Sequence, residues 1–490
     1  MNPPIRRLAW LIALLFAALL VAGSWIQVVD AQDLRERPGN RRTLLNEFGR
    51  ERGQILVDGE AVATSVPSEG RVPWRRTYPQ GEQYAHVTGW FSLIYGSGGG
   101  LEDAQSSLLS GTDDSLFYRR LPDLLTGQEP AGATIETTID PSAQRAASEA
   151  LGDRRGAAIA IDPRSGAILA MVSHPTFDPS ALSQEDVSRV EAAWKELNAD
   201  PERPLVNRTI GGNTYPPGSV FKLVTAAAAL EDDLLEPDST VPAPRTYTLP
   251  GTNTTLRNFG GKACTQDESD EQSLSDALRV SCNTAFADLG AELGDERLRT
   301  AAEDFGFGEQ IRVPMRVTTS TFPDDPTEAQ TALAALGQHD VRVTPLQVAL
   351  ISAAIANGGQ AKEPHLVEQV LDQELDVISR AEAGDMGRAV SPETAEQLRE
   401  MMVSVVESGT GRAAAIPGVR VAGKTGTAEF DDPDGRVHAW FTGFAPADDP
   451  QVAVAVVVED VGRSASGETG TGGSVAAPIA RSMMEEVITR

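Results

Sequence analysis

Ser219 and Lys222 form the one Ser-x-x-Lys pair of the chain, and this spacing could support nucleophilic catalysis. A serine hydroxyl is a weak nucleophile until a base removes its proton. A lysine can be that base when burial lowers its pKa, because its neutral amine is then available. The residues Tyr215-Pro216-Pro217-Gly218 can end any preceding element, and the alanine-rich stretch up to Leu230 favours a helix. Ser219 should therefore lie at a helix N-terminus, with Lys222 one turn further on the same face.

Lysine is scarce in this chain, which strengthens the case for Lys222 as a base. Of 42 basic side chains only five are lysines, so 37 are arginines. If position 222 needed only a positive charge, arginine would be the expected residue. Arginine stays protonated and cannot act as a base.

The segment Ser281-Cys282-Asn283, which follows Leu274–Val280, is a second candidate. In a functional interpretation, the Ser281 hydroxyl relays a proton and the Asn283 amide holds an amide of the substrate. Serine and asparagine are also both common as helix caps and in turns, where they have no catalytic role. The pattern by itself leaves both interpretations open.

Lys424-Thr425-Gly426-Thr427 is a third candidate, which we place on an edge strand beside a groove. A glycine in such a strand lets the backbone of a substrate approach closely. The lysine amine and the threonine hydroxyls could then hold a carboxylate.

The same segment also matches a P-loop when it is read from Gly418 to Thr425, and Val452–Asp460 imitates a Walker B strand. A P-loop needs a strand, a phosphate-wrapping loop and then a helix. The intervening residues 419–422 are typical of a strand, and Gly426-Thr427 is a poor helix start. We therefore discount an NTPase.

Composition excludes several other functions. The chain has 490 residues, 70 of them acidic, and a formal net charge of −28, so we expect no nucleic-acid partner. It lacks CxxC pairs, an HExxH motif and Cys/His clusters at zinc spacing, so we expect no metal and no other cofactor. A Ser-His-Asp hydrolase has no Gly-x-Ser-x-Gly elbow here. We interpret the five histidines as ordinary surface or packing residues: His86, His174, His339, His365 and His438.

The elements that must position the three candidates are predicted by hydrophobic patterning. Ala157–Ile161 and Ala167–Val172 are apolar runs joined by a turn sequence, which indicates a hairpin. Helical patterns follow, and strand-like runs return late in the chain. This order predicts an α+β domain with one sheet built from both ends of the segment. The expected helices are Ser219–Leu230, Leu346–Ala356, Pro392–Val406 and Val475–Val487, and the late strands are Val419–Thr427, Ala439–Phe444 and Val452–Glu459.

The N-terminus contains Arg6 and Arg7 followed by Leu8–Val29, a run of 22 residues without a charged side chain. As a helix this run would measure roughly 33 Å, enough to cross a bilayer. Its basic flank predicts that residues 1–7 are cytoplasmic and that the remainder lies outside. The alternative is a cleaved signal peptide with a cleavage-like Val29-Asp30-Ala31. We favour a retained anchor because the apolar run is long.

Residues 30–136 are less regular and predict a small, loop-rich, membrane-proximal domain. This segment contains the charged run Arg50-Glu51-Arg52, β-like Gln54–Val57 and glycine-rich Gly96–Gly100. We expect its charged patches to be solvated surface. From about Thr137 the pattern becomes tighter, so residues 137–490 are expected to form the catalytic domain.

The three candidates, in this order and spacing, resemble the signature of penicillin-binding proteins and serine β-lactamases. The resemblance covers roughly residues 137–490 and, more loosely, Arg52-Gly53 and Gly89–Glu102. An anchor followed by a short first domain resembles a class B, monofunctional member of an actinobacterial type. A class A protein would need a further glycosyltransferase of about 200 residues, for which the chain has no room. Further matching segments are Thr137–Asp140, Gly166–Ser173, Asn207-Arg208, Val343–Gln347 and Thr471–Gly473.

The resemblance implies a serine β-lactamase-like domain, an antiparallel sheet flanked by helices, that acts as a peptidoglycan D,D-transpeptidase and is acylated by β-lactams. Ser219 would be the nucleophile, Lys222 its general base and Ser281 the proton relay. Backbone N–H groups of Ser219 and Thr427 would form the oxyanion hole. Three of the remaining site residues would bind the terminal carboxylate of the substrate, namely Lys424, Thr425 and Thr427, and Asn283 would hold the donor amide. Gly426 is the further site residue, and it would let the substrate backbone approach.

The resemblance also implies partners. Peptidoglycan stem peptides would be the substrate and β-lactam antibiotics the inhibitors. A class B member has no polymerase of its own, so a membrane glycosyltransferase of the RodA/FtsW type and the elongation or division machinery are expected beside it. The alternatives are a D,D-carboxypeptidase, a β-lactamase, or a non-catalytic penicillin-binding sensor or division scaffold.

Cys264 and Cys282 are the two cysteines, and Cys282 occupies the variable position of the second motif. The exported compartment permits disulfides, so we predict a Cys264–Cys282 bridge. Two buried free thiols are the alternative.

Overall fold

The structure is a computed structural model. It describes residues 3–28, 48–116, 131–212, 214–231, 234–265, 269–429, 436–462 and 470–489.

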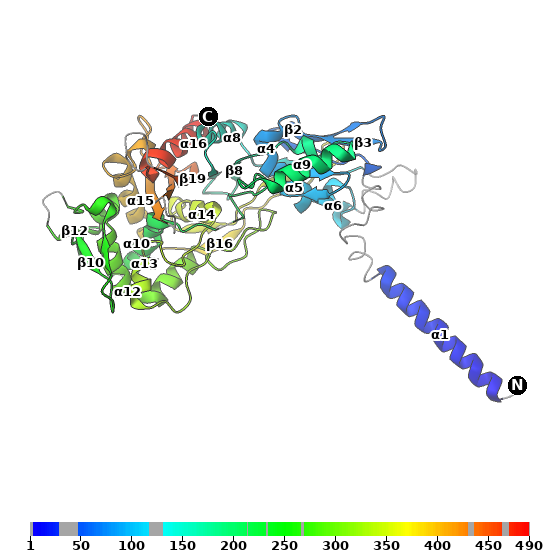
Figure 1. The fold of residues 1–490 in the computed structure, drawn as a ribbon, viewed down its shortest axis with the longest axis horizontal. Helices are drawn as coiled ribbons and strands as arrows, with labels where there is room; N and C mark the ends of the chain where they lie inside the picture. Colours follow the sequence, from blue (N-terminus) through cyan, green and yellow to red (C-terminus); the bar gives the residue numbers. More distant parts are fainter. Residues whose placement is uncertain are drawn as a thin grey trace.

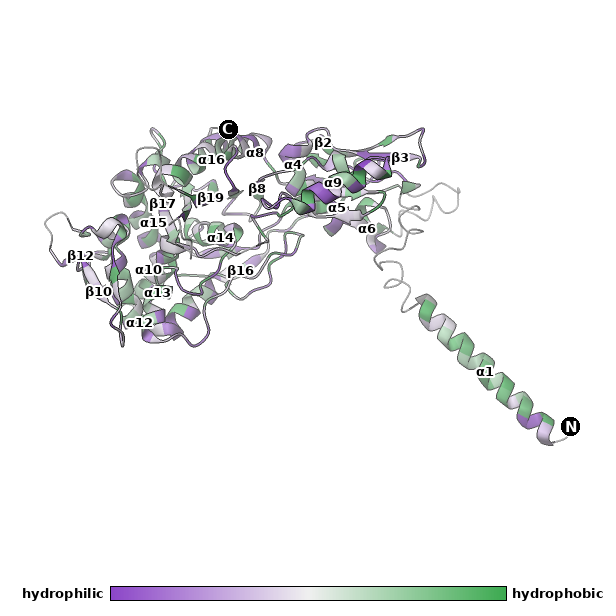
Figure 2. Cartoon of the chain, in the orientation of Figure 1, coloured by the Kyte–Doolittle hydropathy of each residue, from purple (hydrophilic) through white to green (hydrophobic). Residues whose placement is uncertain are grey.

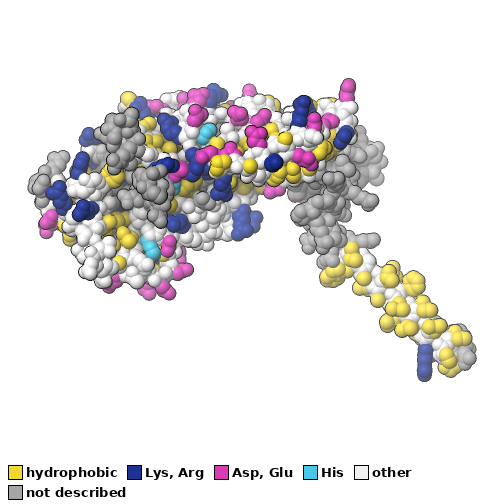
Figure 3. Space-filling model, in the orientation of Figure 1, with side chains coloured by type: hydrophobic (Ala, Val, Ile, Leu, Met, Phe, Trp, Pro, Cys, Tyr) yellow, Lys and Arg dark blue, Asp and Glu magenta, His cyan; other side chains and the backbone are white. Residues whose placement is uncertain are grey.

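Helix α1 spans Pro3–Val28 and lies apart from the rest of the described chain (Figure 1). Its side chains are apolar along almost its whole length, with basic side chains near the N-terminal end (Figures 2 and 3). Within the described residues it is the one helix both long and apolar enough to cross a membrane. It begins five residues before the predicted start at Leu8. The cleavage-like Val29-Asp30-Ala31 lies outside the described residues.

A five-stranded antiparallel sheet forms the centre of the larger part of the molecule, in the order β17-β18-β19-β7-β8. The predicted hairpin is confirmed as β7 and β8, and the sheet combines it with the three late strands. The sheet is thus built from both ends of the segment, as predicted. The strands are β7 (Gly156–Ile161), β8 (Ile168–His174), β17 (Ala422–Glu429), β18 (Val437–Ala445) and β19 (Val452–Val461).

Both faces of this sheet are covered by helices, which explains the continuous apolar strands. Along β19, Val454 and Val456 pack in one hydrophobic cluster, whereas Ala455 and Val457 pack in the other. Successive side chains of a strand point to opposite faces, so a strand buried on both faces is apolar at every position. Helices α8 (Pro141–Leu151) and α16 (Ala477–Ile488) cover one face, and α14 (Pro345–Ala356) covers the other.

The helical side of the molecule carries the remaining elements around the candidate residues. The predicted helices are confirmed with small shifts at their ends. The first begins with a 3-10 turn, η3, and the last is preceded by a π-helical turn, η6. The elements are η3 (Gly218–Phe221), α10 (Lys222–Glu231), α11 (Leu274–Arg279), α12 (Asn283–Asp304), α13 (Glu328–Ala334), α15 (Pro392–Glu407) and η6 (Gly472–Ala476), with the strand pairs β10 (Thr246–Thr248)/β11 (Thr255–Arg257) and β9 (Thr240–Pro242)/β12 (Glu271–Ser273).

A second sheet, of six strands, crosses the predicted boundary at residue 137. Its order is β15-β14-β6-β1-β2-β3, and β6 pairs with β1 on one side and with β14 on the other. Strands from both sides of the boundary therefore share one sheet, and the division into 30–136 and 137–490 stays a prediction. The strands are β1 (Ile55–Val57), β2 (Glu60–Pro67), β3 (Trp74–Thr77), β6 (Thr134–Thr137), β14 (Val367–Leu371) and β15 (Val377–Arg380).

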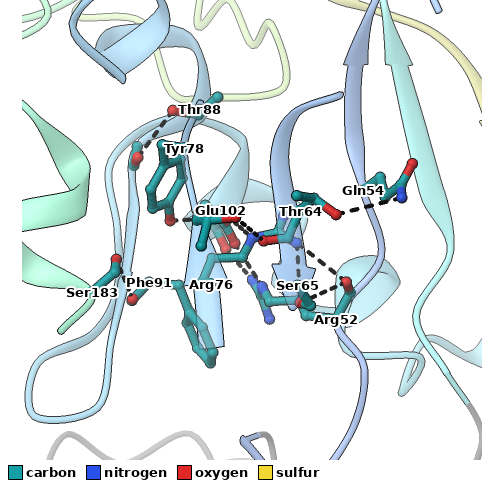
Figure 4. A network of polar contacts seen from close by, with 12 residues as sticks. Arg52, Gln54, Thr64, Ser65, Arg76, Tyr78, Thr88, Phe91, Glu102 and Ser183 are labelled. Carbon is teal, nitrogen blue, oxygen red and sulfur yellow. Dashed lines mark hydrogen bonds and ion pairs between the residues drawn. The ribbon is translucent and has the colours of Figure 1, made fainter. Parts of the chain in front are cut away.

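Arg52 corrects one expectation about this region. We expected the charged run 50–52 to be solvated, but Arg52 is only 3% exposed. Its Nε donates to Glu102 Oε2 at 2.6 Å, and Arg76 Nε donates to Glu102 Oε1 at 2.5 Å (Figure 4). Tyr78 adds a hydroxyl bond of 3.2 Å to the same carboxylate. A charge can be buried when it is paired and hydrogen-bonded, and the two guanidinium groups lower the pKa of Glu102 against the effect of its burial.

Candidate active site

Ser219 lies in η3, directly before α10, on a turn that presses against strand β17. Gly218 has φ +54°, a conformation that favours glycine. A Cβ atom at this position would come within 3.1 Å of Ala428 Cα and of Thr427 O. Gly218 also donates its N–H to Gly337 O at 2.9 Å. The half-buried Ser219 is thereby held next to β17, and its position directly before α10 agrees with the predicted helix N-terminus.

Lys222 is the first residue of α10, one turn beyond Ser219, and is fully buried. Its Nζ donates to Asn283 Oδ1 at 2.7 Å and to Ser281 O at 2.9 Å, and lies 3.4 Å from Ser281 Oγ. The Ser219 hydroxyl forms no hydrogen bond with any residue in the described ranges. Catalytic hydrogen bonds are often long or absent before a substrate binds. The structure thus joins the first and second motifs through Lys222.

Ser281 lies between α11 and α12, with φ +60°, and Asn283 begins α12. Ser281 Oγ accepts a hydrogen bond from Lys424 Nζ at 2.9 Å. The hydroxyl of Ser281 therefore lies within reach of both lysine amines. This joins the second motif to the third.

Lys424, Thr425 and Gly426 lie on β17, which is the edge strand of the five-stranded sheet, as predicted. Lys424 is fully buried, and its Nζ also donates to Thr425 O at 2.8 Å. Strand β17 continues to Glu429 where a P-loop would need a helix, so the NTPase interpretation has no support in the fold. A Cβ atom on Gly426 would meet Pro217 O at 3.1 Å, which shows how tightly the Pro217-Gly218 turn before Ser219 packs on β17.

Burial controls the protonation of both lysines. It lowers the pKa of Lys222 well below the usual value, and the second cause is the neighbouring charge of Lys424. Burial also lowers the pKa of Lys424 to about 7. Neither lysine has a carboxylate partner in the described part of the chain. A buried amine without an anionic partner favours its neutral form, which is the form that a general base requires.

Several residues around the site were missed by sequence reasoning. Asn258 Oδ1 accepts the backbone N–H groups of Asn283 and Thr284, at 2.9 and 3.0 Å. The hydroxyls of Thr410 and Thr425 lie 2.6 Å apart. Asn258 and Thr410, the two residues that were missed, lie in connecting segments whose sequence has no periodic or motif signal. Their contacts therefore become visible only in three dimensions.

Cys264 and Cys282 form a disulfide in the structure, in agreement with the prediction. The bridge joins the middle residue of the second motif to the loop that carries Asn258. Among the described residues, His, Cys, Asp and Glu side chains form no group that could hold a metal ion.

Comparison with known proteins identifies the family. Residues 156–485 match the penicillin binding protein transpeptidase domain, and residues 52–135 match the penicillin binding protein A dimerisation domain. The chain is a class B penicillin-binding protein. It is 44% identical to the peptidoglycan D,D-transpeptidase PbpA of Mycolicibacterium smegmatis, with 98% of each chain covered. It is 42% identical to PbpA of Mycobacterium tuberculosis, over 100% of this chain and 99% of the relative.

The structure of this penicillin-binding protein agrees with the sequence comparison. It matches penicillin-binding protein A from M. tuberculosis in a ceftriaxone acyl-enzyme complex, with a TM-score of 0.86 and 42% identity. That match covers 91% of this chain and 100% of the other. A penicillin G acyl-enzyme complex of the same relative matches with a TM-score of 0.84. The α+β fold and the resemblance to an actinobacterial class B type are thus confirmed.

Proposed function

We propose that this penicillin-binding protein is a peptidoglycan D,D-transpeptidase in which Ser219 forms the acyl-enzyme. The observation that carries the proposal is the buried pair of Lys222 and Lys424, both with lowered pKa, which converge on Ser281. Lys222 lies one helical turn after Ser219. The β-lactam acyl-enzyme complexes of the similar M. tuberculosis protein support the same reaction class.

Acylation begins when neutral Lys222 takes the proton of Ser219. The freed oxygen attacks the carbonyl carbon of the penultimate D-Ala of a stem peptide, and the carbonyl oxygen becomes an oxyanion. Backbone N–H groups of Ser219 and Thr427 stabilise this oxyanion. The proposal is supported by the packing of the Gly218 turn on Thr427, which brings the two backbones together.

Ser281 then passes a proton to the departing D-Ala amine. Its hydroxyl lies 3.4 Å from Lys222 Nζ and 2.9 Å from Lys424 Nζ, so it can connect the base to the leaving group. Asn283 holds the donor amide. Lys424, Thr425 and Thr427 bind the terminal carboxylate on the open edge of β17, and Gly426 lets the substrate backbone approach.

In the second half-reaction an amine of a neighbouring stem peptide attacks the Ser219 ester. The ester bond breaks, a cross-linking amide forms, and the serine regains its proton. A β-lactam imitates the D-Ala-D-Ala end and acylates Ser219, but its ring-opened product stays attached and gives no leaving amine.

We further propose that α1 retains the protein in the membrane, with residues 1–7 in the cytoplasm and the catalytic part outside. The apolar length of α1 and its basic N-terminal flank support this orientation. A polymerase in the same membrane, of the RodA/FtsW type, is the proposed partner, together with the elongation or division machinery.

Labelling with fluorescent penicillin tests the nucleophile. Wild-type protein should be labelled covalently and the Ser219→Ala variant should not; labelling of that variant would remove Ser219 from the proposal. Incubation with lipid-linked peptidoglycan then separates the candidate reactions. Cross-linked dimers indicate a transpeptidase, and loss of D-Ala alone indicates a carboxypeptidase. A labelled protein that forms neither product indicates a penicillin-binding sensor, and an unlabelled wild type indicates a scaffold.

A further inference from the structure

Asn258 provides the N-terminal cap of α12 from a distant part of the sequence. It follows β11 and is 8% exposed. Its Oδ1 accepts from the N–H groups of Asn283 and Thr284, the first two residues of α12. Both partners are donors, so the amide oxygen, and not the nitrogen, must face the helix.

Helix α12 has no cap of its own. The residue at its N-cap position is Cys282, which makes no side-chain cap bond and is joined to Cys264. Thr284 is fully buried, so water cannot replace a lost partner of its N–H group. Without Asn258 the N–H group of Thr284 would be unsatisfied, because the first N–H groups of a helix have no partner within it.

Asn283, the first residue of α12, and Ser281, two residues before it, carry acceptors for both catalytic lysines. Asn283 Oδ1 and Ser281 O accept from Lys222, and Ser281 Oγ accepts from Lys424. Ser281 adopts a positive φ of 60°, which a residue other than glycine keeps only when its surroundings hold it. A shift of this turn would therefore move the proton relay and both lysine partners together.

We propose that Asn258 is a positioning residue that holds the Ser281-Cys282-Asn283 segment in line with Lys222 and Lys424. This role rests on the function proposed above. Asn258 acts through the backbone of α12 and touches neither lysine in the hydrogen-bond network. Arg257 O adds a weaker contact, a 3.4 Å bond from Asn283 Nδ2.

The disulfide makes the proposal testable, because it keeps the loop attached to α12 when the cap is removed. Asn258→Leu preserves the approximate size and removes the acceptor. Asn258→Asp keeps an acceptor oxygen and adds a negative charge. The matched control is Asp186→Ala, since Asp186 caps the remote helix α9 (Val187–Ala199) through N–H bonds of 3.0 and 3.3 Å.

The experiment follows covalent labelling of the full-length protein in detergent by fluorescent penicillin, over a range of concentrations and pH. We expect Asn258→Leu to lower the saturating acylation rate constant about 10²-fold with a smaller change in half-saturating concentration, since misalignment impairs the chemical step. Asn258→Asp should regain a near wild-type plateau at higher pH, because a carboxylate raises the pKa of nearby Lys222. Asp186→Ala should acylate like wild type.

The outcomes separate the two proposals. A wild-type protein that is never labelled overturns the proposed function. A wild type that is labelled, with Asn258→Leu equally fast, overturns only the role of Asn258. If Asn258→Leu shows no cooperative thermal transition, it has not folded, and the Asn258→Asp variant decides. If the saturating acylation rate constant of Asn258→Asp stays below that of the wild type at every pH, the positioning role is overturned.

Discussion

Lys424 destabilises the fold that it serves, and replacing it by methionine should show this. The amine is fully buried and burial lowers its pKa from 10.5 to about 7. The gap between the two pKa values, about 3.5, corresponds to about 5 kcal/mol, at about 1.4 kcal/mol per pKa unit. Methionine has a similar length without an ionisable group, so it removes this penalty.

The sign of the pH dependence follows from proton binding. Between pH 7 and 10.5 the unfolded chain carries a proton on Lys424 that the folded chain has lost. The free energy of unfolding therefore rises with pH in this window, by about 1.4 kcal/mol per pH unit from this group. At pH 6 both states are protonated, and nearly the full penalty of about 5 kcal/mol is present.

The net effect of Lys424→Met is smaller, because two hydrogen bonds, to Ser281 Oγ and Thr425 O, are lost. At about 1 kcal/mol each they reduce the gain to about 3 kcal/mol at pH 6. The gain should fall below about 1 kcal/mol by pH 8.5. Loss of the Lys424 charge also relieves Lys222, which acts in the same direction.

Urea denaturation of the full-length protein in detergent, at intervals from pH 6 to 9, measures this difference, while fluorescent penicillin measures acylation. The variant should be more stable at pH 6 and much slower to acylate. Lys362→Met is the matched control, since Lys362 forms a partly exposed pair with Asp385 and should change stability by less than about 1 kcal/mol. A stability difference between wild type and Lys424→Met that is constant from pH 6 to 9 would refute the reasoning.

Three further predictions concern other residues. Lys222→Arg should lower the acylation rate at least about 10²-fold in the penicillin assay, because arginine cannot give up its proton; an active variant would reduce Lys222 to a positive charge. Glu102→Gln should lower the free energy of unfolding in urea by about 3–5 kcal/mol, because two arginines would remain buried without their carboxylate, and an unchanged midpoint would contradict this. Thiol counting on denatured, unreduced protein should find no free thiol, whereas two would exclude the Cys264–Cys282 bridge, which we expect to contribute about 3 kcal/mol.

Local patterns predicted the parts of this protein that depend on near neighbours in the chain. The β7–β8 hairpin and the helix that begins at the Ser219 turn follow from strand periodicity, turn residues and helix propensity over a few residues. Arg52 shows where such reasoning fails. A charged run is usually solvated, but the Glu102 carboxylate that pairs with Arg52 lies fifty residues away.

The amino-acid sequence by itself determined the long apolar helix at the N-terminus, the α+β order of elements and the three motifs, because each is a matter of residue type and short spacing. Tertiary structure alone decided that Lys222 and Lys424 meet at Ser281, that both are buried with a lowered pKa, and that Asn258 caps α12. The physical reason is that proton affinity and hydrogen-bond satisfaction depend on the exclusion of water and on neighbours in space.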